Sequence, residues 1–222
     1  MREAIDASGL RDDEVLLDQP ADVEIVDEAI VFTGKVWDIR HETFRYNDDI
    51  LGRDFVAHTG AVAVLVLDDD DRMLAIRQYR HPVRLREWEI PAGLLDIAGE
   101  DPLQAAQREL AEEVDLTADH WSVLSDYATS PGGSNEIIRI FVARGLHAID
   151  DAFARTGEEA DIELRWVSLD DAYEAALNRQ ITNSVILIAV LSAYASRARG
   201  WSTLIPGDSP WPLRRWRDAS GR

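Results

Sequence analysis

The pattern of apolar and polar positions predicts strands in the first third of the chain. Residues 23–32, 36–46 and 50–57 are rich in β-branched and aromatic side chains, which favour strands. The Asn-Asp-Asp sequence at 47–49 is typical of a turn between the last two segments. These segments predict a small antiparallel N-terminal sheet.

The next two apolar segments flank an acidic turn. Residues 61–67 (AVAVLVL) are continuously apolar, as in a strand buried on both faces, and residues 73–80 (MLAIRQYR) follow the turn. This pattern predicts a hairpin. We interpret the carboxylates at 68–71 as turn residues and not as a metal site.

The rest of the chain alternates strand and helix patterns. We expect strands at 121–127, 137–143 and 163–167, and helices at 169–178 and 182–197. This order predicts an α+β fold with helices packed on a mixed sheet. We divide the chain into an N-terminal sheet (1–57), a central domain (58–198) and a Trp- and Arg-rich tail (199–222) whose role the sequence leaves open.

Composition narrows the class of protein. With 222 residues, 46% of them hydrophobic, the chain can bury a full core. The longest apolar run, 185–195, is too short to span a bilayer, and the N-terminus lacks a signal-peptide pattern, so we expect a cytoplasmic protein.

The absence of cysteine excludes disulfides and thiolate sites. The five histidines lack metal-ligand spacing, which favours structural or surface roles.

Charge argues against two classes of partner. A formal net charge of −19 repels nucleic acid and anionic membranes. The first thirty residues are strongly acidic, whereas residues 196–222 carry six arginines. The two ends could pair with each other, or each could be a solvated tail.

One helix carries the candidate chemistry. Asp101 as N-cap, Pro102 at the first position and Gln104 as a capping-box partner predict where it begins. An apolar stripe then packs it onto the sheet: Leu103, Ala106, Leu110 and Val114.

The acidic residues of this helix gather on one face. Glu109, Glu112 and Glu113 are spaced three and four residues apart over the small Ala105, and such like charges destabilise a helix. A solvated face is one interpretation. A bound cation is the other, and oxygen ligands without His or Cys select Mg²⁺ or Mn²⁺. Arg108, one turn before Glu112, can hold that carboxylate.

These residues resemble the Nudix box, GX5EX7REUXEEXGU. Glu100 lies seven residues before Arg108, and the sequence 108–116 reads RELAEEVDL. Six residues instead of five separate Gly93 from Glu100, and Asp115 replaces the last glycine. Neither departure removes a carboxylate, and Asp tolerates left-handed backbone angles better than most residues.

The resemblance implies an α/β/α sandwich and hydrolysis of a nucleoside diphosphate linked to another group. The sequences RQYRHPV, EWEIPAG and SPGGSNE are similar to those of the ADP-ribose pyrophosphatase subgroup, whose members are usually homodimers with an exchanged N-terminal sheet. We therefore expect Mg²⁺-dependent cleavage of ADP-ribose to AMP and ribose 5-phosphate. Another nucleotide sugar, such as GDP-mannose, and a sensor that binds without cleaving remain alternatives.

The resemblance also implies roles for individual residues. The Ala92 carbonyl, Glu109 and Glu113 would ligate Mg²⁺, and Glu112 would ligate it or support the ligands. Glu158, with Glu159 as a close second, would be the base from a loop after the box, although an exposed acidic loop is the alternative. The candidate substrate-binding residues are Arg53, Arg80, Gly93, Ser130, Gly132, Gly133, Glu136 and Trp37. For Arg53 a surface salt bridge, and for Trp37 a place in the core, are the competing interpretations.

Overall fold

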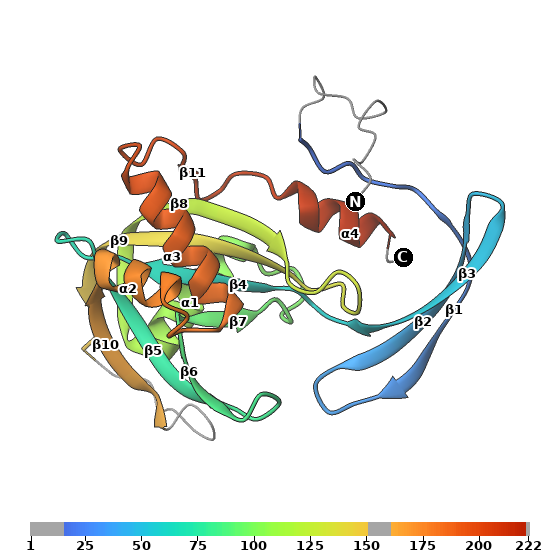
Figure 1. Cartoon of the computed structure of the whole chain (residues 1–222), viewed down its shortest axis with the longest axis horizontal. Helices are drawn as coiled ribbons and strands as arrows, with labels where there is room; N and C mark the ends of the chain where they lie inside the picture. The colour runs from blue at the N-terminus through green and yellow to red at the C-terminus, as the bar shows by residue number, and fades with distance from the viewer. Residues whose placement is uncertain (1–15, 151–160, 221–222) are drawn as a thin grey trace, which may run out of the picture.

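The protein has an α+β fold in which three sheets and four helices are described (Figure 1). This architecture comes from a computed structural model that describes residues 16–150 and 161–220. The predicted fold class is confirmed. Within these residues no helix is both long and apolar enough to cross a bilayer.

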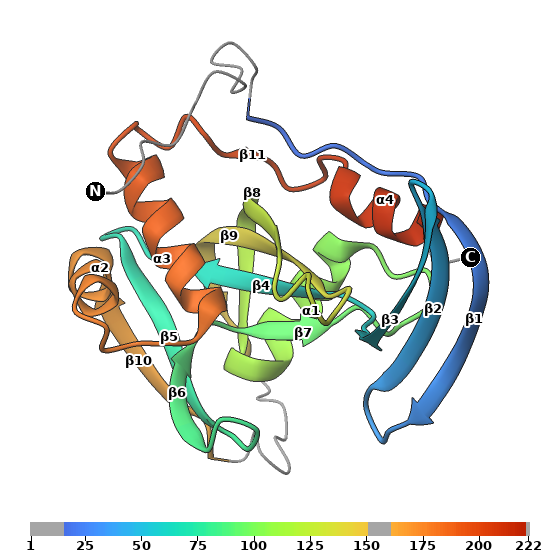
Figure 2. The same ribbon diagram turned by 45° about the vertical axis from the view of Figure 1, so that its right-hand side comes forward.

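The predicted N-terminal sheet forms. Strands β1 (Glu24–Thr33), β2 (Asp38–Tyr46) and β3 (Asp49–Ala57) pair in antiparallel order. Asn47 takes a positive φ of 55° in the turn between β2 and β3, which is a backbone conformation that Asn tolerates. The sheet extends to one side of the other elements (Figures 1 and 2).

The second sheet is mixed, as expected. Its five strands follow the order β11 (Ile205–Pro206), β8 (Leu116–Ala128), β9 (Ile137–Ala148), β4 (Ala61–Val66) and β7 (Ala92–Leu94). Strands β4 and β9 are parallel, and the other pairs are antiparallel. Strands β7 and β11 were not predicted, because two or three residues are too few to show an alternating pattern.

The predicted hairpin at 61–80 is only partly correct. The acidic turn forms, and a single bridge joins Leu67 to Met73. The chain then leaves the mixed sheet, and β5 (Arg72–Arg80) lies between β10 (Glu163–Ser168) and β6 (Leu85–Glu89) in a third sheet. The strands diverge because both edges of β4 are already occupied by β7 and β9.

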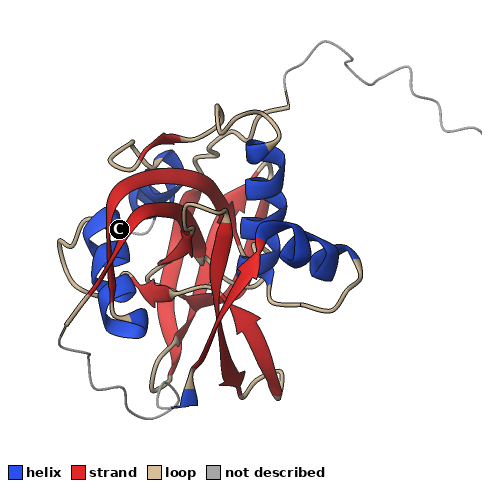
Figure 3. Ribbon diagram, turned by 90° about the vertical axis from the view of Figure 1, so that its left-hand side faces the viewer, coloured by secondary structure: helices blue, strands red, loops and turns tan. Residues whose placement is uncertain are grey.

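Helices cover both faces of the mixed sheet (Figure 3). The side chains of β4 alternate between two cores. One core contains Ala63 and Leu65 with α2 (Leu169–Leu177) and α3 (Ser184–Arg197). The other contains Val62 and Val64 with α1 (Pro102–Val114). A strand buried on both faces therefore produces the α/β/α layering. Helix α4 (Pro212–Ser220), in the tail, was not predicted.

Candidate active site

Helix α1 begins and ends as its sequence predicts. The Asp101 carboxylate accepts a hydrogen bond from the Leu103 N–H at 2.9 Å, and Pro102 occupies the first turn. The described hydrogen bonds include none between the Asp101 side chain and the Gln104 N–H, and none from Gln104 back to Asp101, so the predicted N-cap forms without the predicted capping box. Asp115 ends the helix at φ 55° and ψ 39°, the left-handed conformation expected where the Nudix box has glycine.

Arg108 organises the acidic face of α1. Its Nε and Nη2 atoms donate to the two oxygens of Glu100 at 2.9 and 3.1 Å. Its Nη1 atom donates to Glu109 at 2.6 Å and to Glu112 at 3.1 Å. The predicted contact with Glu112 therefore forms, and it belongs to a larger network. Hydrogen bonds from Arg108 hold the pKa of Glu100 below its ordinary value, and Glu100 in turn raises the pKa of Arg108.

Strand β7 lies directly against this face. The buried Glu113 carboxylate accepts a hydrogen bond from the Ala92 N–H at 3.0 Å. The carboxylate of Glu109 occupies the space beside Gly93, where an added Cβ would lie 1.9 Å from Glu109 Cδ. Gly93 is thus required by close approach, since any larger residue would displace a carboxylate.

The donor set of this site fits a hard divalent cation. The structure brings Glu109, Glu112 and Glu113 onto one helical face beside Ala92 of β7, and carboxylate and carbonyl oxygens are the ligands of Mg²⁺ and Mn²⁺. Among the described residues no three acidic or histidine side chains already form a metal cluster. Arg108 instead donates to the carboxylates of Glu109 and Glu112.

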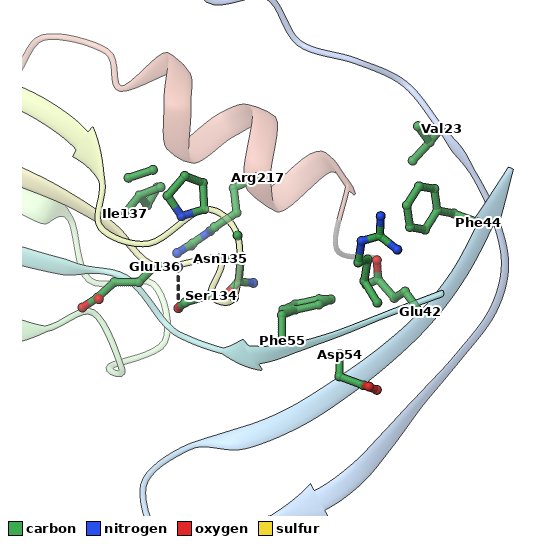
Figure 4. A pocket seen from close by; sticks show the side chains of 15 residues that line it. Val23, Glu42, Phe44, Asp54, Phe55, Ser134, Asn135, Glu136, Ile137 and Arg217 are labelled. Carbon is green, nitrogen blue, oxygen red and sulfur yellow. Dashed lines mark hydrogen bonds between the residues drawn. The ribbon is translucent and has the colours of Figure 1, made fainter. Parts of the chain in front are cut away.

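A pocket of about 470 Å³ lies between the N-terminal sheet and the 131–137 loop (Figure 4). Of the predicted substrate-binding residues, it is lined by Arg53, Gly132, Gly133 and Glu136. Ser130 does not line it, and its carbonyl accepts hydrogen bonds from the N–H groups of Gly133 and Ser134 at 2.9 and 3.0 Å. Ser130 thus shapes the loop that forms the wall.

The same loop is hydrogen-bonded to the end of β3 and to the residue that follows this strand. Val56 N–H donates to the Gly133 carbonyl at 3.0 Å, and His58 N–H donates to Asn135 Oδ1 at 2.7 Å. One wall of the pocket is thereby attached to the N-terminal sheet.

Glu136 is held from two sides. Thr129 Oγ1 donates to its Oε2 at 2.7 Å, and His58 Nε2 lies 3.1 Å from its Oε1. Because His58 Nδ1 accepts the Gly60 N–H at 2.9 Å, the ring proton belongs on Nε2 and is donated to Glu136. Burial lowers the pKa of His58, the charge of Glu136 opposes this, and that of Arg217 adds to it. His58 therefore stays neutral and orients Glu136.

Trp37 and Arg80 lie outside the lining of this pocket. Trp37 stacks on His58 with ring centroids 4.0 Å apart and is half-buried. Arg80 forms a two-bond ion pair with the buried Glu89, with both hydrogen bonds at 2.7 Å. The Arg80 side chain remains 42% exposed, so it is accessible as well as anchored.

Strand β4 connects the acidic face with the pocket. Ala63 and Val62 pair with Ala92 and Gly93 of β7, while Ala61 pairs with Ile138, one residue beyond the pocket wall. The candidate bases Glu158 and Glu159 fall outside the described residues.

Several lining residues were missed by the sequence analysis. Phe44, Phe55, Asn135 and Arg217 line the pocket, and His58 supports it. Asn135 stands within the quoted SPGGSNE segment and could have been found there. Arg217 belongs to no sequence motif. It reaches the pocket only because the folded tail places it there.

Comparison with known proteins identifies the family. The NUDIX domain model matches residues 57–186. The ADP-ribose pyrophosphatase of Mycobacterium tuberculosis (strain ATCC 25618 / H37Rv) is 38% identical over 191 residues, which cover 86% of this chain and 91% of that protein. The methanol dehydrogenase activator of Bacillus methanolicus is 35% identical over 161 residues, or 72% and 86% of the two chains.

A solved structure supports the same fold. This chain superposes on the crystal structure of an ADP compounds hydrolase with a TM-score of 0.65 and 19% sequence identity. The superposition covers 83% of this chain and 99% of the other. The family match extends over more than half of the chain and includes α1 with its acidic face. This chain belongs to the Nudix family.

Proposed function

We propose that this protein hydrolyses the diphosphate of ADP-ribose to AMP and ribose 5-phosphate with Mg²⁺, for which Mn²⁺ can substitute. The observation that carries the proposal is the carboxylate face of α1, packed against β7 and joined through β4 to a 470 Å³ pocket. The 38% identity to an ADP-ribose pyrophosphatase over most of both chains supports this substrate.

In this proposal the acidic face holds the cation. The Ala92 carbonyl, Glu109 and Glu113 would be its ligands, and Glu112 would be a ligand or orient the other ligands. A bound Mg²⁺ would neutralise the diphosphate and lower the pKa of an attacking water. Arg108 keeps Glu100 ionised through its hydrogen bonds and holds the Glu112 carboxylate in place. Glu158, or Glu159 beside it, removes the proton from the water.

The pocket binds the nucleotide in the same proposal. Arg53 and Arg80 contact phosphate oxygens as charge-assisted donors. Glu136, oriented by His58 and Thr129, accepts a hydrogen bond from a ribose hydroxyl or the adenine amino group. Gly132 and Gly133 allow the substrate to approach the backbone closely, and Gly93 makes room for Glu109. Ser130 holds the loop, and Trp37 supports the His58 ring.

We further propose a cytoplasmic homodimer with an exchanged N-terminal sheet. Strand β1 is exposed along almost its whole length, including Val31 at 58% and Phe32 at 61%. Exposed apolar side chains gathered on one sheet mark a surface that another chain can cover. A second copy of the chain would cover these residues.

A substrate panel tests the function. The protein is incubated with ADP-ribose, GDP-mannose and other nucleotide sugars in Mg²⁺, in Mn²⁺ and after metal removal with EDTA, and the released nucleotide and sugar phosphate are identified. We expect AMP and ribose 5-phosphate from ADP-ribose, and no turnover with EDTA. Faster release of GMP from GDP-mannose would favour the other nucleotide sugar, and tight binding of ADP-ribose without any cleavage would favour a sensor.

A further inference from the structure

Residues 205–207 attach the C-terminal tail to the mixed sheet. Strand β11 pairs with Val123 and Ser122 of β8, and the next residue, Gly207, donates its N–H to the Trp121 carbonyl at 3.1 Å. A Cβ at Gly207 would lie 3.1 Å from the same carbonyl oxygen and from Trp121 Cβ. The path of the tail is therefore fixed by backbone contacts before α4 begins (Figure 2).

Arg139 of β9 fastens the following residues. Arg139 is only 2% exposed. Its guanidinium donates to both Asp126 oxygens at 2.8 Å and to the carbonyls of Ser209 and Pro210 at 2.7 and 3.0 Å. The buried Trp211 ring lies beneath it, 4.9 Å from ring centroid to Cζ. A buried cation requires such partners, and the tail supplies two carbonyls and an aromatic face.

This attachment brings Arg217 of α4 to the pocket wall. Arg217 Nη1 donates to the Thr59 carbonyl at 2.9 Å, while Nε and Nη2 donate to Asp218 at 2.9 and 2.6 Å. Figure 4 shows the Arg217 side chain reaching from α4 toward the 131–137 loop. The side chain is only 15% exposed, so it is part of the wall and not a surface charge.

We propose that Arg217 determines specificity by binding an acceptor atom on the nucleoside half of the substrate. A guanidinium has five N–H donors, and the described hydrogen bonds use three, one on each nitrogen. One N–H on each terminal nitrogen is left for a ligand in a pocket that Arg217 lines. Phe44 and Phe55 line the same pocket, and aromatic rings suit a planar base.

The inference rests on the proposed function for its substrate, but the contact can be tested separately. Arg217→Gln removes the charge and the fork of donors, and Arg217→Lys keeps the charge. Arg215→Gln, on the exposed side of the same helix and outside this pocket, is the matched control. The measurements are KM and kcat for ADP-ribose, binding of AMP and of ribose 5-phosphate by calorimetry, and the midpoint of thermal unfolding.

We expect Arg217→Gln to raise KM for ADP-ribose and the dissociation constant of AMP about tenfold, since a hydrogen bond from a charged donor is lost. Binding of ribose 5-phosphate should stay at the wild-type level, Arg217→Lys should lie between, and Arg215→Gln should match the wild type. Equal AMP binding in wild type and Arg217→Gln would overturn the proposal.

A purely structural role predicts another outcome. Arg217→Gln would then weaken AMP and ribose 5-phosphate equally and lower the midpoint of unfolding, and this too would overturn the proposal. If Arg217→Gln fails to fold, the comparison of Arg217→Lys with the wild type decides by the same criteria. If the wild type does not cleave ADP-ribose, the proposed function fails, yet AMP calorimetry still tests Arg217.

Discussion

Among single residues, the polar contacts of Glu112 and Glu113 distinguish the possible roles of these two carboxylates. Glu113 is buried and accepts the Ala92 N–H, whereas Glu112 is 44% exposed and pairs with Arg108. The two adjacent glutamates of the box therefore have different surroundings. Because Glu113 is buried and contacts β7, its carboxylate is shielded from solvent and lies inside the candidate site.

We predict that Glu113→Gln lowers kcat by roughly 10²-fold or more at saturating Mg²⁺, because it removes a ligand charge. The fold should survive, since the amide oxygen can still accept the Ala92 N–H. Steady-state kinetics and thermal unfolding check both statements, with Glu174→Gln on the exposed face of α2 as control. Near-normal turnover in Glu113→Gln would contradict the metal assignment.

The neutral His58 couples stability to pH. Burial lowers its pKa from the ordinary 6.5, while Glu136 raises it and Arg217 lowers it. The unfolded chain thus binds the proton at a higher pH than the folded protein does, so the free energy of unfolding falls as pH decreases below 6.5. Protonation of Nδ1 would also break the hydrogen bond from the Gly60 N–H.

Urea unfolding between neutral pH and the acidic range measures this dependence. We expect His58→Gln to lose part of the decline in stability toward acidic pH that the wild type shows. His147→Gln, at an exposed position, should retain it because His58 is still present. Parallel curves for His58→Gln and the wild type would show that another group is responsible.

At the scale of secondary structure elements, the buried Arg139 joins β9, β8 and the tail. Its ion pair with Asp126 lies within the mixed sheet, and its two carbonyl contacts reach residues about seventy positions later in the chain. The chain before α4 therefore depends for its position on this side chain as well as on the backbone contacts of β11 and Gly207.

We predict that Arg139→Leu lowers the free energy of unfolding by about 3 kcal/mol, because Asp126 loses its partner and two carbonyls lose their donor. Affinity for AMP should fall as well if α4 shifts. Urea unfolding and calorimetry test these effects against Arg199→Leu, whose side chain is exposed. Wild-type stability in Arg139→Leu would show that β11 alone holds the tail.

In the whole molecule, the N-terminal sheet carries apolar side chains, such as Val31 and Phe32, that are exposed to solvent in a single chain. It extends to one side in Figure 1, yet Arg53, Phe44 and Phe55 of the pocket belong to it. Assembly and nucleotide binding should therefore depend on the same segment, residues 24–57.

We predict that the wild type sediments as a dimer and that Val31→Asp with Phe32→Asp yields monomers, because both side chains are more than half exposed. Leu177→Asp, at an exposed apolar position on α2, should remain dimeric. Deletion of residues 1–57 should reduce both dimerisation and affinity for nucleotide. A truncated chain that stays folded, monomeric and active would show that the sheet is dispensable.

The features that depend on neighbouring residues could be predicted from the sequence. The boundaries of α1, the left-handed Asp115 and the ion pair between Arg108 and Glu112 follow from contacts within a turn or two of helix. The continuous apolar run at 61–67 determined that β4 is buried between two layers. Such features are predictable because the periodicity of a helix or strand places the side chains without reference to the rest of the chain.

The tertiary structure sets which distant segments meet. It separated β5 from β4, since β7 and β9 occupy both edges of β4. It brought His58 to Glu136 and, across 158 positions, Arg217 to Thr59. No periodic pattern encodes these contacts, because each depends on where a strand or tail crosses the completed sheet, and that path is set by the packing of the whole core.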